Sequence, residues 1–176
     1  MAACTTNEQA EPPPDLPSDS QMEEATPAPE PSDAARAHAE LQRILDGSMV
    51  GTVDFSQLNT GVRIVAFARG LDDGLFGLHI HEGGSCDQPG LHFNPADTDH
   101  GEPGSVDGSR HAGDLGNIRS ENGRARYDRI DTVLRMDSTD SIIGRVVSIH
   151  IGQDDLNTQP SGEAGDIAVC GVIEAR

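Results

Sequence analysis

The distribution of histidine constrains this chain more than any other feature of the sequence. Six of its seven histidines lie between positions 79 and 150, and an aspartate at position 114 closely follows one of them. The six are His79, His81, His92, His100, His111 and His150. A fold that gathers this much imidazole and carboxylate can hold two metal ions. The seventh, His38, stands apart, and we predict that it is not a ligand.

The pair His79 and His81 has a geometry of its own. In an extended segment alternate side chains point to opposite faces, so Leu78 and Ile80 would face a core while both histidines share the other face. Two neutral imidazoles at this spacing form part of a site for a transition metal such as copper or zinc. An isolated pair is more often two surface histidines on a half-buried strand, but further candidate ligands follow this one.

The downstream candidates lie in a segment rich in glycine, proline and aspartate. They are His92, His100, His111 and Asp114, and the composition of residues 86–117 predicts a long loop without regular structure. Such loops in a compact domain are usually functional or disordered, and a bound metal can order them. Three histidines and an aspartate form a closed, tetrahedral, zinc-like set. The alternative is a solvated polar loop whose histidines share no role.

Seven short motifs in this order resemble the copper/zinc superoxide dismutase family. They are G-L-H-I-H-E at 77–82, L-H-F-N-P at 91–95, H-G-x-P at 100–103, R-H-A-G-D-L-G-N-I at 110–118, I-I-G-R-V-V-S-I-H at 142–150, D-D-L at 154–156 and A-V-C-G-V-I at 168–173. The resemblance implies that superoxide is disproportionated to dioxygen and hydrogen peroxide by redox cycling of copper, while zinc is structural.

The same resemblance implies a role for each candidate ligand. Copper would be held by His79, His81, His92 and His150, the expected catalytic residues, and zinc by His92, His100, His111 and Asp114. His92 would bridge the two metals. Asp154 matches the carboxylate that orients one copper ligand and one zinc ligand in the family. An ordinary loop aspartate is the alternative for Asp154.

Composition between the motifs favours an all-β fold. Short runs rich in β-branched residues recur between turns, and aromatic residues make up only 3% of the chain. We expect strands at 49–55, 62–68, 124–127, 132–136, 144–150 and 167–173, with a turn at 59–61. With the resemblance, this pattern predicts a Greek-key, immunoglobulin-like β-sandwich or flattened barrel with long metal-binding loops. Residues 39–176 are enough for one such domain.

Residues 1–38 differ in composition from the rest of the chain. They are rich in proline, acidic and small polar residues, which cannot bury a core, so we expect a disordered acidic tether. The Ala2-Ala3-Cys4 start resembles the end of a bacterial lipoprotein signal, although the hydrophobic stretch of such a signal is absent. A lipidated Cys4 would tether the protein to a membrane. Over residues 32–45 we expect a short helix with Ser32 as its N-cap.

The resemblance also pairs Cys86 with Cys170 in the family's intrasubunit disulfide, the alternative being two buried free thiols. A persistent disulfide indicates an oxidising compartment. Together with the lipoprotein-like start, it predicts an extracytoplasmic protein that is periplasmic or at the cell surface. The short connection between His81 and Cys86 omits residues that dimeric eukaryotic members place at their interface, so a monomer stays open beside a homodimer.

Two departures from the family concern the approach of superoxide. Ile167 stands where the family keeps an arginine beside copper, and Asp166 precedes it. The chain has no lysine and a formal net charge of -18, of which residues 39–176 carry about -11. Electrostatic focusing changes association rates by roughly 10 to 10³, so we expect slower, less salt-sensitive dismutation. The second hypothesis is a copper/zinc-binding protein of this type with little turnover. Strong acidity also argues against nucleic-acid and anionic-membrane partners.

Overall fold

The computed structural model describes residues 35–105 and 109–176. Its strands are β1 (Arg36–Arg43), β2 (Met49–Leu58), β3 (Gly61–Arg69), β4 (Gly74–His81), β5 (Asp114–Glu121), β6 (Arg124–Asp131), β7 (Val146–His150), β8 (Ile167–Val172) and β9 (Glu174–Ala175). Cys4, Ser32 and most of the predicted tether lie outside the described residues. Nowhere in the described ranges is there a helix long and apolar enough to cross a membrane.

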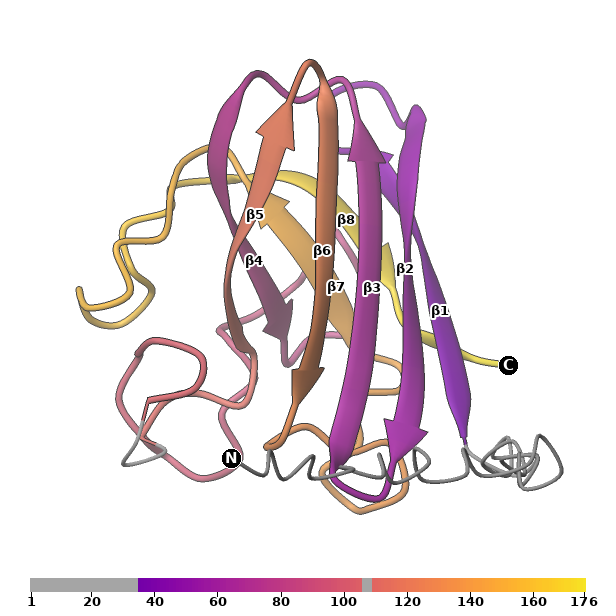
Figure 1. Ribbon diagram of the computed structural model, residues 1–176, viewed down its shortest axis with the longest axis vertical. Helices are drawn as coiled ribbons and strands as arrows, with labels where there is room; N and C mark the ends of the chain where they lie inside the picture. Colours follow the sequence, from indigo (N-terminus) through magenta and orange to yellow (C-terminus); the bar gives the residue numbers. More distant parts are fainter. Residues whose placement is uncertain (1–34, 106–108) are drawn as a thin grey trace, which may run out of the picture. The chain divides into compact units, whose positions relative to one another are not determined.

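The first eight strands close into an antiparallel barrel. They are ordered β2-β3-β6-β5-β4-β7-β8-β1, and β1 also pairs with β2, which closes the sheet. The return of β7 to lie beside β4 gives the spatial order β7-β4-β5-β6 of a Greek key. Figure 1 shows β3, β6, β5 and β4 side by side across the front of the barrel. The expected all-β, Greek-key fold is confirmed.

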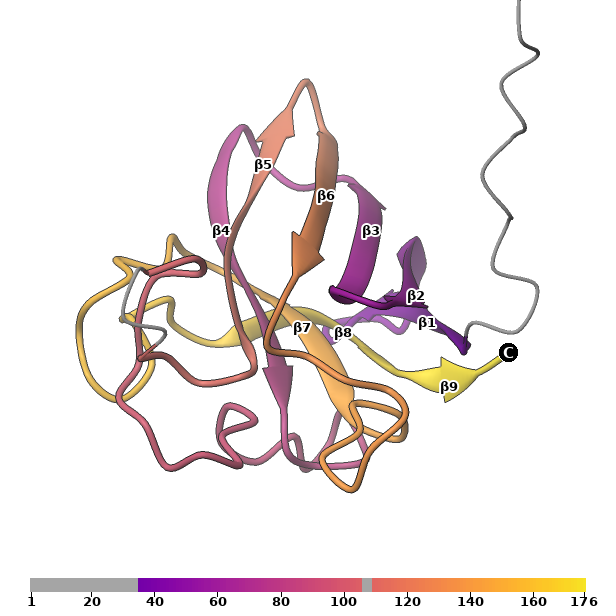
Figure 2. The same ribbon diagram turned by 60° about the horizontal axis from the view of Figure 1, so that its bottom comes forward.

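Two long loops leave the barrel on the same side. The connection from β4 to β5 includes the described residues 82–105 and 109–113, and residues 151–166 connect β7 to β8. These segments lie near each other in both views (Figures 1 and 2). A disulfide between Cys86 and Cys170 joins the first loop to β8 across 84 positions of sequence, as the resemblance implied. The two loops therefore fold back over one part of the barrel surface.

The helix expected over residues 32–45 is wrong, because residues 36–43 form β1. Ala37, Ala39 and Leu41 are at most 1% exposed, whereas Arg36 and Glu40 face outward, which is the two-residue period of a strand. Alanine, leucine, glutamate and arginine favour helices in isolation. Pairing with β2 and β8, which closes the barrel, outweighs that local preference.

Two other expectations of local structure are also wrong. The strand expected at 132–136 is an irregular turn, because the Asp131 carboxylate accepts hydrogen bonds from the backbone N–H groups of Val133 and Leu134, at 2.9 and 3.0 Å. Leu134 and Met136 are buried nevertheless. The predicted loop over 86–117 ends earlier than expected, since its last four residues already belong to β5.

Candidate metal centre

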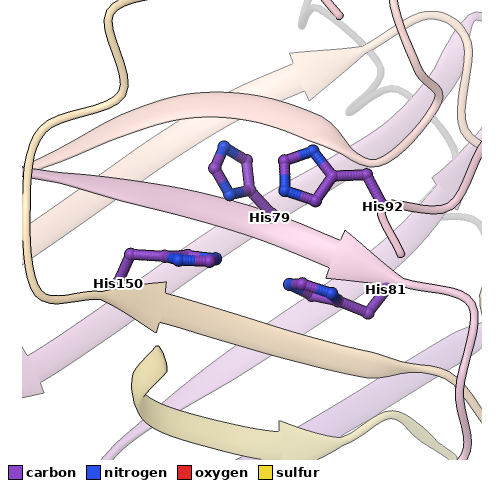
Figure 3. A group of neighbouring side chains, drawn as sticks. All are labelled: His79, His81, His92 and His150. Atoms are coloured by element: carbon purple, nitrogen blue, oxygen red, sulfur yellow. The ribbon is translucent and has the colours of Figure 1, made fainter. Parts of the chain in front are cut away.

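Four histidines lie close together near the C-terminal end of β4. His79 and His81 come from this strand, His150 ends the neighbouring strand β7, and His92 comes from the loop that follows β4. Leu78 and Ile80 alternate with the pair and are wholly buried in the core, as the strand pattern predicted. Figure 3 shows the four rings turned toward a common space. One ring nitrogen of each lies within 4.8 Å of one ring nitrogen of every other.

Hydrogen bonds on the far side of three rings fix which nitrogen is free. His79 Nε2 donates to the Asp154 carboxylate at 2.8 Å, His81 Nδ1 to the Gly90 carbonyl at 3.0 Å, and His150 Nδ1 to the Gly165 carbonyl at 2.7 Å. These oxygens can only accept, so the proton of each neutral ring is on the bonded nitrogen. The lone pairs of His79 Nδ1, His81 Nε2 and His150 Nε2 therefore remain for a metal.

Buried nitrogens without a partner support this interpretation. Among the described residues, His79 Nδ1, His92 Nε2 and His150 Nε2 are buried and have no hydrogen-bond partner. A buried polar atom left unpaired costs about 1–3 kcal/mol, so several in one place indicate a binding site for a ligand. His81 Nε2 is 3.0 Å from the Ser148 hydroxyl. The donor set consists of imidazole nitrogens, which suits copper.

A second cluster shares His92 with the first. Its members are His92, His100, His111 and Asp114. The Nδ1 atoms of the three histidines lie 2.8, 3.1 and 3.1 Å from one oxygen of Asp114, Oδ1. The other oxygen, Oδ2, accepts hydrogen bonds from the backbone N–H groups of Gly101 and His111. Three imidazoles and one carboxylate converge without an open position, which is the arrangement of a structural zinc site.

The carboxylate of Asp154 links the two clusters through hydrogen bonds. One of its oxygens accepts a hydrogen bond from His79 Nε2, and the other accepts from His100 Nε2 at 3.0 Å. Its side chain is wholly buried. A Cβ at Gly162 would overlap this carboxylate, and Gly162 has φ of +68°, so both space and backbone conformation require glycine there. Asp154 thus orients one histidine of each cluster.

Three residues that hold the ligands in place were not found by sequence reasoning. Asn117 on β5 donates to the backbone carbonyl of Asp154 and accepts from its backbone N–H, both at 2.9 Å. Gln159 makes the same pair of contacts with the backbone of His100, at 2.8 and 2.9 Å. The buried guanidinium of Arg110 donates to the carbonyls of residues 111, 112 and 114 and to Asp131. The partners of Asn117 and Gln159 lie 37 and 59 positions away, so no local sequence pattern joins them.

Burial and hydrogen bonding shift the pKa values of the clustered groups. Burial lowers the pKa of His79 to about 3 and that of His81 to about 4, so both rings are neutral and able to bind metal at neutral pH. Burial alone would raise the pKa of Asp114 and Asp154, but hydrogen bonds from the histidines hold both well below their usual range. Both carboxylates are therefore ionised.

Comparison with known proteins decides the family. Residues 49–173 match the family described as "Copper/zinc superoxide dismutase (SODC)". Copper-zinc superoxide dismutase A of Xenopus laevis is 39% identical over 138 residues, which are 72% of this chain and 90% of that protein. The chain belongs to the copper/zinc superoxide dismutase family. Its cofactors are copper and zinc, and its substrate is superoxide.

The pocket beside the first cluster is acidic in this superoxide dismutase. It has a volume of about 690 Å³, and its walls include His81, His92 and His150. Glu82, Asp97 and Asp99 also line it, and no arginine is among its lining residues in the described part of the chain. An anion approaching the histidines therefore meets carboxylates rather than the guanidinium that the family pattern places there.

The residue that the resemblance aligns with the family's arginine lies next to the first cluster. Ile167 is the cross-strand partner of His150 in the β7–β8 pair, and it is partly buried. Neither nearby guanidinium can take over its role. Arg110 is buried in its contacts with backbone carbonyls and Asp131. Arg145 stacks on the Phe93 ring, 3.7 Å from the centroid, and donates to the carbonyls of Glu82 and Ser141.

Two further residues from the sequence analysis remain, His38 and Cys4. His38 lies on the outer face of the barrel and bonds Asp54 on β2 at 2.8 Å, remote from both clusters in sequence and in its contacts. Cys4 lies outside the described residues.

Proposed function

We propose that His79, His81, His92 and His150 hold copper in this dismutase and that His92, His100, His111 and Asp114 hold zinc, with His92 shared. The observation that carries the assignment is the pair of clusters with a single common member. The first cluster consists of four imidazole side chains beside a pocket, and the second is closed by a carboxylate. The pocket is lined by three members of the first set and, in the second set, by His111 and the shared His92, so a small substrate can reach a redox-active metal held by the first set.

The reaction requires one-electron chemistry, which copper supplies when bound and zinc does not. Two superoxide anions and two protons yield dioxygen and hydrogen peroxide, so the protein must also deliver protons. His92 Nε2 faces the first cluster without a hydrogen-bond partner, and His92 Nδ1 faces Asp114 at 2.8 Å. We assign to His92 Nε2 the role of holding a proton beside the pocket when it is not bound to metal.

We further propose that the protein turns over more slowly than members that keep the arginine. The pocket carries three carboxylates, and Ile167 offers no charge beside His150. Removal of focusing charge lowers association rates by roughly 10 to 10³. The second hypothesis, a copper/zinc-binding protein with little turnover, is favoured by the same residue, since a site without its anion-positioning group still binds both metals.

An Ile167→Arg variant separates these two functions. With copper and zinc content verified, we expect a clear parental dismutase rate and a several-fold gain in the variant. Ile151→Arg is the matched control, because it adds the same charge next to His150 at an exposed position outside the pocket lining. If superoxide disappears with the parental protein no faster than in buffer without protein, and only Ile167→Arg shows a large gain in rate, the metal-binding function is supported instead. Equal gains in both variants would rule out a specific role for position 167.

We also propose an extracytoplasmic location, with an acidic tether that ends before Arg36 rather than at residue 38, because β1 begins at Arg36 and belongs to the functional domain. The disulfide between Cys86 and Cys170 supports an oxidising compartment, periplasmic or at the cell surface. A lipidated Cys4 would anchor the tether to a membrane, and mass spectrometry of the native N-terminus tests this directly. An unmodified cysteine in the native protein would contradict lipidation.

Assembly and nucleic-acid binding complete the proposal. All seven ligand residues come from one chain, so a homodimer is compatible with the site but not needed to build it. Sedimentation of the metal-loaded protein distinguishes monomer from dimer. The net charge of -18 supports our proposal that nucleic acid is not a partner.

A further inference from the structure

Four arginines gather on the outer face of β3, β6 and β5, although the chain as a whole is strongly acidic. We call Arg69, Arg119, Arg124 and Arg126 the arginine array. They are four of the twelve cationic residues of the sequence, and all four side chains are exposed. The three strands lie side by side in Figure 1 and in the pairing register.

The register arranges the array in two rows across the strands. The first row is Phe67, Arg126 and Arg119, and the second is Arg69, Arg124 and Glu121. Directly opposed residues of an antiparallel pair share a face, with Cβ atoms about 4.5–5.5 Å apart. In the first row Arg126 on β6 is directly opposite Arg119 on β5. In the second row Arg124 on β6 is directly opposite Arg69 on β3.

Acidic neighbours compensate only part of the positive charge of the array. Arg126 interacts electrostatically with Asp128, two positions along β6. The one ion pair of the array among the described residues joins Arg119 Nη1 to Glu121 Oε1 at 3.6 Å, and both side chains are more than 60% exposed. Arg69 lies 5.1 Å from the centroid of the Phe67 ring. By contrast Arg63, also on β3, binds the Asp128 carboxylate with two hydrogen bonds of 3.1 and 2.8 Å. Like charges placed directly opposite destabilise a sheet, and a bound anion would relieve that repulsion.

The array also borders a hollow. A pocket of about 650 Å³ is lined by Phe67, Arg119, Glu121, Asn122, Arg124 and Arg126. Guanidinium groups form paired hydrogen bonds with phosphate oxygens, and several forks around one hollow can contact several phosphates. The repulsion from the rest of this acidic protein is screened beyond about 8 Å at physiological ionic strength, so direct contacts decide the binding.

We propose that the arginine array is a binding site for a polyvalent phosphate, a ligand whose closely spaced phosphate groups contact several guanidinium groups at once. The site is separate from the metal centre. Arg119 lies five positions beyond Asp114 on β5, which is about 17 Å at roughly 3.4 Å per residue of strand. A phosphate chain bound there takes no part in dismutation.

Isothermal titration of the full, metal-loaded protein with inorganic tripolyphosphate tests this inference. We expect saturable binding, with orthophosphate binding much more weakly. Because charge-assisted hydrogen bonds contribute about 1.5–3 kcal/mol each, the Arg119→Gln/Arg126→Gln variant should bind at least about tenfold more weakly. Its dismutase rate and metal content should not change. Arg69→Gln/Arg124→Gln removes the other pair and should weaken binding in the same way.

The matched control is Arg36→Gln/Arg176→Gln, which lowers the net charge equally at exposed positions outside the array. It should retain wild-type affinity. It also controls for chelation, since tripolyphosphate would withdraw metal from all variants alike. The inference is overturned by the absence of saturable binding to the wild type, or by equal affinity in the array and control variants. Tighter binding of a single-stranded oligonucleotide than of tripolyphosphate would contradict the choice of ligand.

Discussion

At the scale of single residues, Asp154 is the most informative side chain. It touches one histidine of each cluster and is wholly buried. Replacing it with asparagine keeps the size of the side chain and leaves one acceptor oxygen for two histidine donors. Loss of such an orienting group typically lowers metal affinity by about 10–100-fold. We expect Asp154→Asn to lose affinity for both copper and zinc in competition with a chelator.

Asp155→Asn is the control for that experiment. Asp155 is exposed and accepts hydrogen bonds from the backbone of Asn157 and Thr158 within its own loop. Its replacement should leave both metal affinities unchanged. Unchanged metal affinity in Asp154→Asn, or an equal loss of metal affinity in both variants, would show that Asp154 does not orient the ligands.

Tyr127 offers a second test at this scale, because it is the single tyrosine in a chain without tryptophan. Burial raises its pKa from 10.0 to about 12, and its hydroxyl donates to the Leu115 carbonyl at 2.9 Å. The neutral phenol therefore contributes stability that is fully present below about pH 10 and is lost as the pH rises through about 12. Tyrosinate absorption should titrate near 12 in the native protein and near 10 in denaturant. A native midpoint near 10, or a remaining signal in Tyr127→Phe, would contradict this account.

The ligands were predictable from the sequence, whereas the residues that hold them were not. His79 and His81 reveal their shared face by alternation with Leu78 and Ile80, which needs only the geometry of a strand. Gln159 and Asn117 have no such local signal. Each clamps a backbone 59 or 37 positions away, and such contacts depend on how the two long loops fold over the barrel.

At the scale of elements, the disulfide fixes the loop that carries His92 to the barrel. It closes 84 positions of sequence between the loop residue Cys86 and the strand residue Cys170. Constraining a loop of this length in the unfolded chain is worth on the order of 4 kcal/mol. We expect Cys86→Ser/Cys170→Ser to lower the free energy of unfolding of the metal-free protein by about that amount. Both proteins should carry Cys4→Ser, which removes thiol exchange.

Denaturant titration measures this difference. A loss below about 1 kcal/mol would mean that the loop is held by its other contacts and that the unfolded chain is not constrained as the loop-closure argument assumes.

The strand β1 shows where local sequence preference fails. Residues 36–43 contain good helix formers. The segment has only 8 residues, so its alternation of buried and exposed side chains is a weak signal for a strand. Closure of the barrel decides the outcome, because β2 and β8 would otherwise keep open edges. The opposite error at 132–136 has a comparable cause. A side-chain contact by Asp131 ends the pairing that the β-branched residues would favour.

At the scale of the whole molecule, the extent of the functional domain can be tested by truncation. Removal of residues 1–34 should leave the free energy of unfolding unchanged within about 0.5 kcal/mol. Removal through Arg43 should prevent folding, because it deletes β1 with the buried residues Ala37, Ala39 and Leu41. Thermal unfolding of both proteins measures the difference. Equal stability of the two truncated forms would show that β1 is dispensable for the barrel.

Charge at this scale is distributed unevenly over the protein. Carboxylates line the pocket beside the four histidines, whereas the arginine array lies farther along β5 and β6. Composition alone could predict the sign of the net charge but not this separation, which arises from strand register. The uneven distribution has a direct consequence for catalysis, since the substrate is an anion and the attractive charges are away from its path.

The dismutation rate as a function of ionic strength therefore tests the central claim most directly. Rapid-mixing measurements on protein with verified copper and zinc content should give a rate constant well below the diffusion limit, and this constant should stay level or rise as salt screens the acidic pocket. A rate near about 10⁹ M⁻¹s⁻¹ that falls steeply with salt would mean that superoxide is steered to the copper site by attractive charge. That result would contradict the account of Ile167 and the acidic pocket given above.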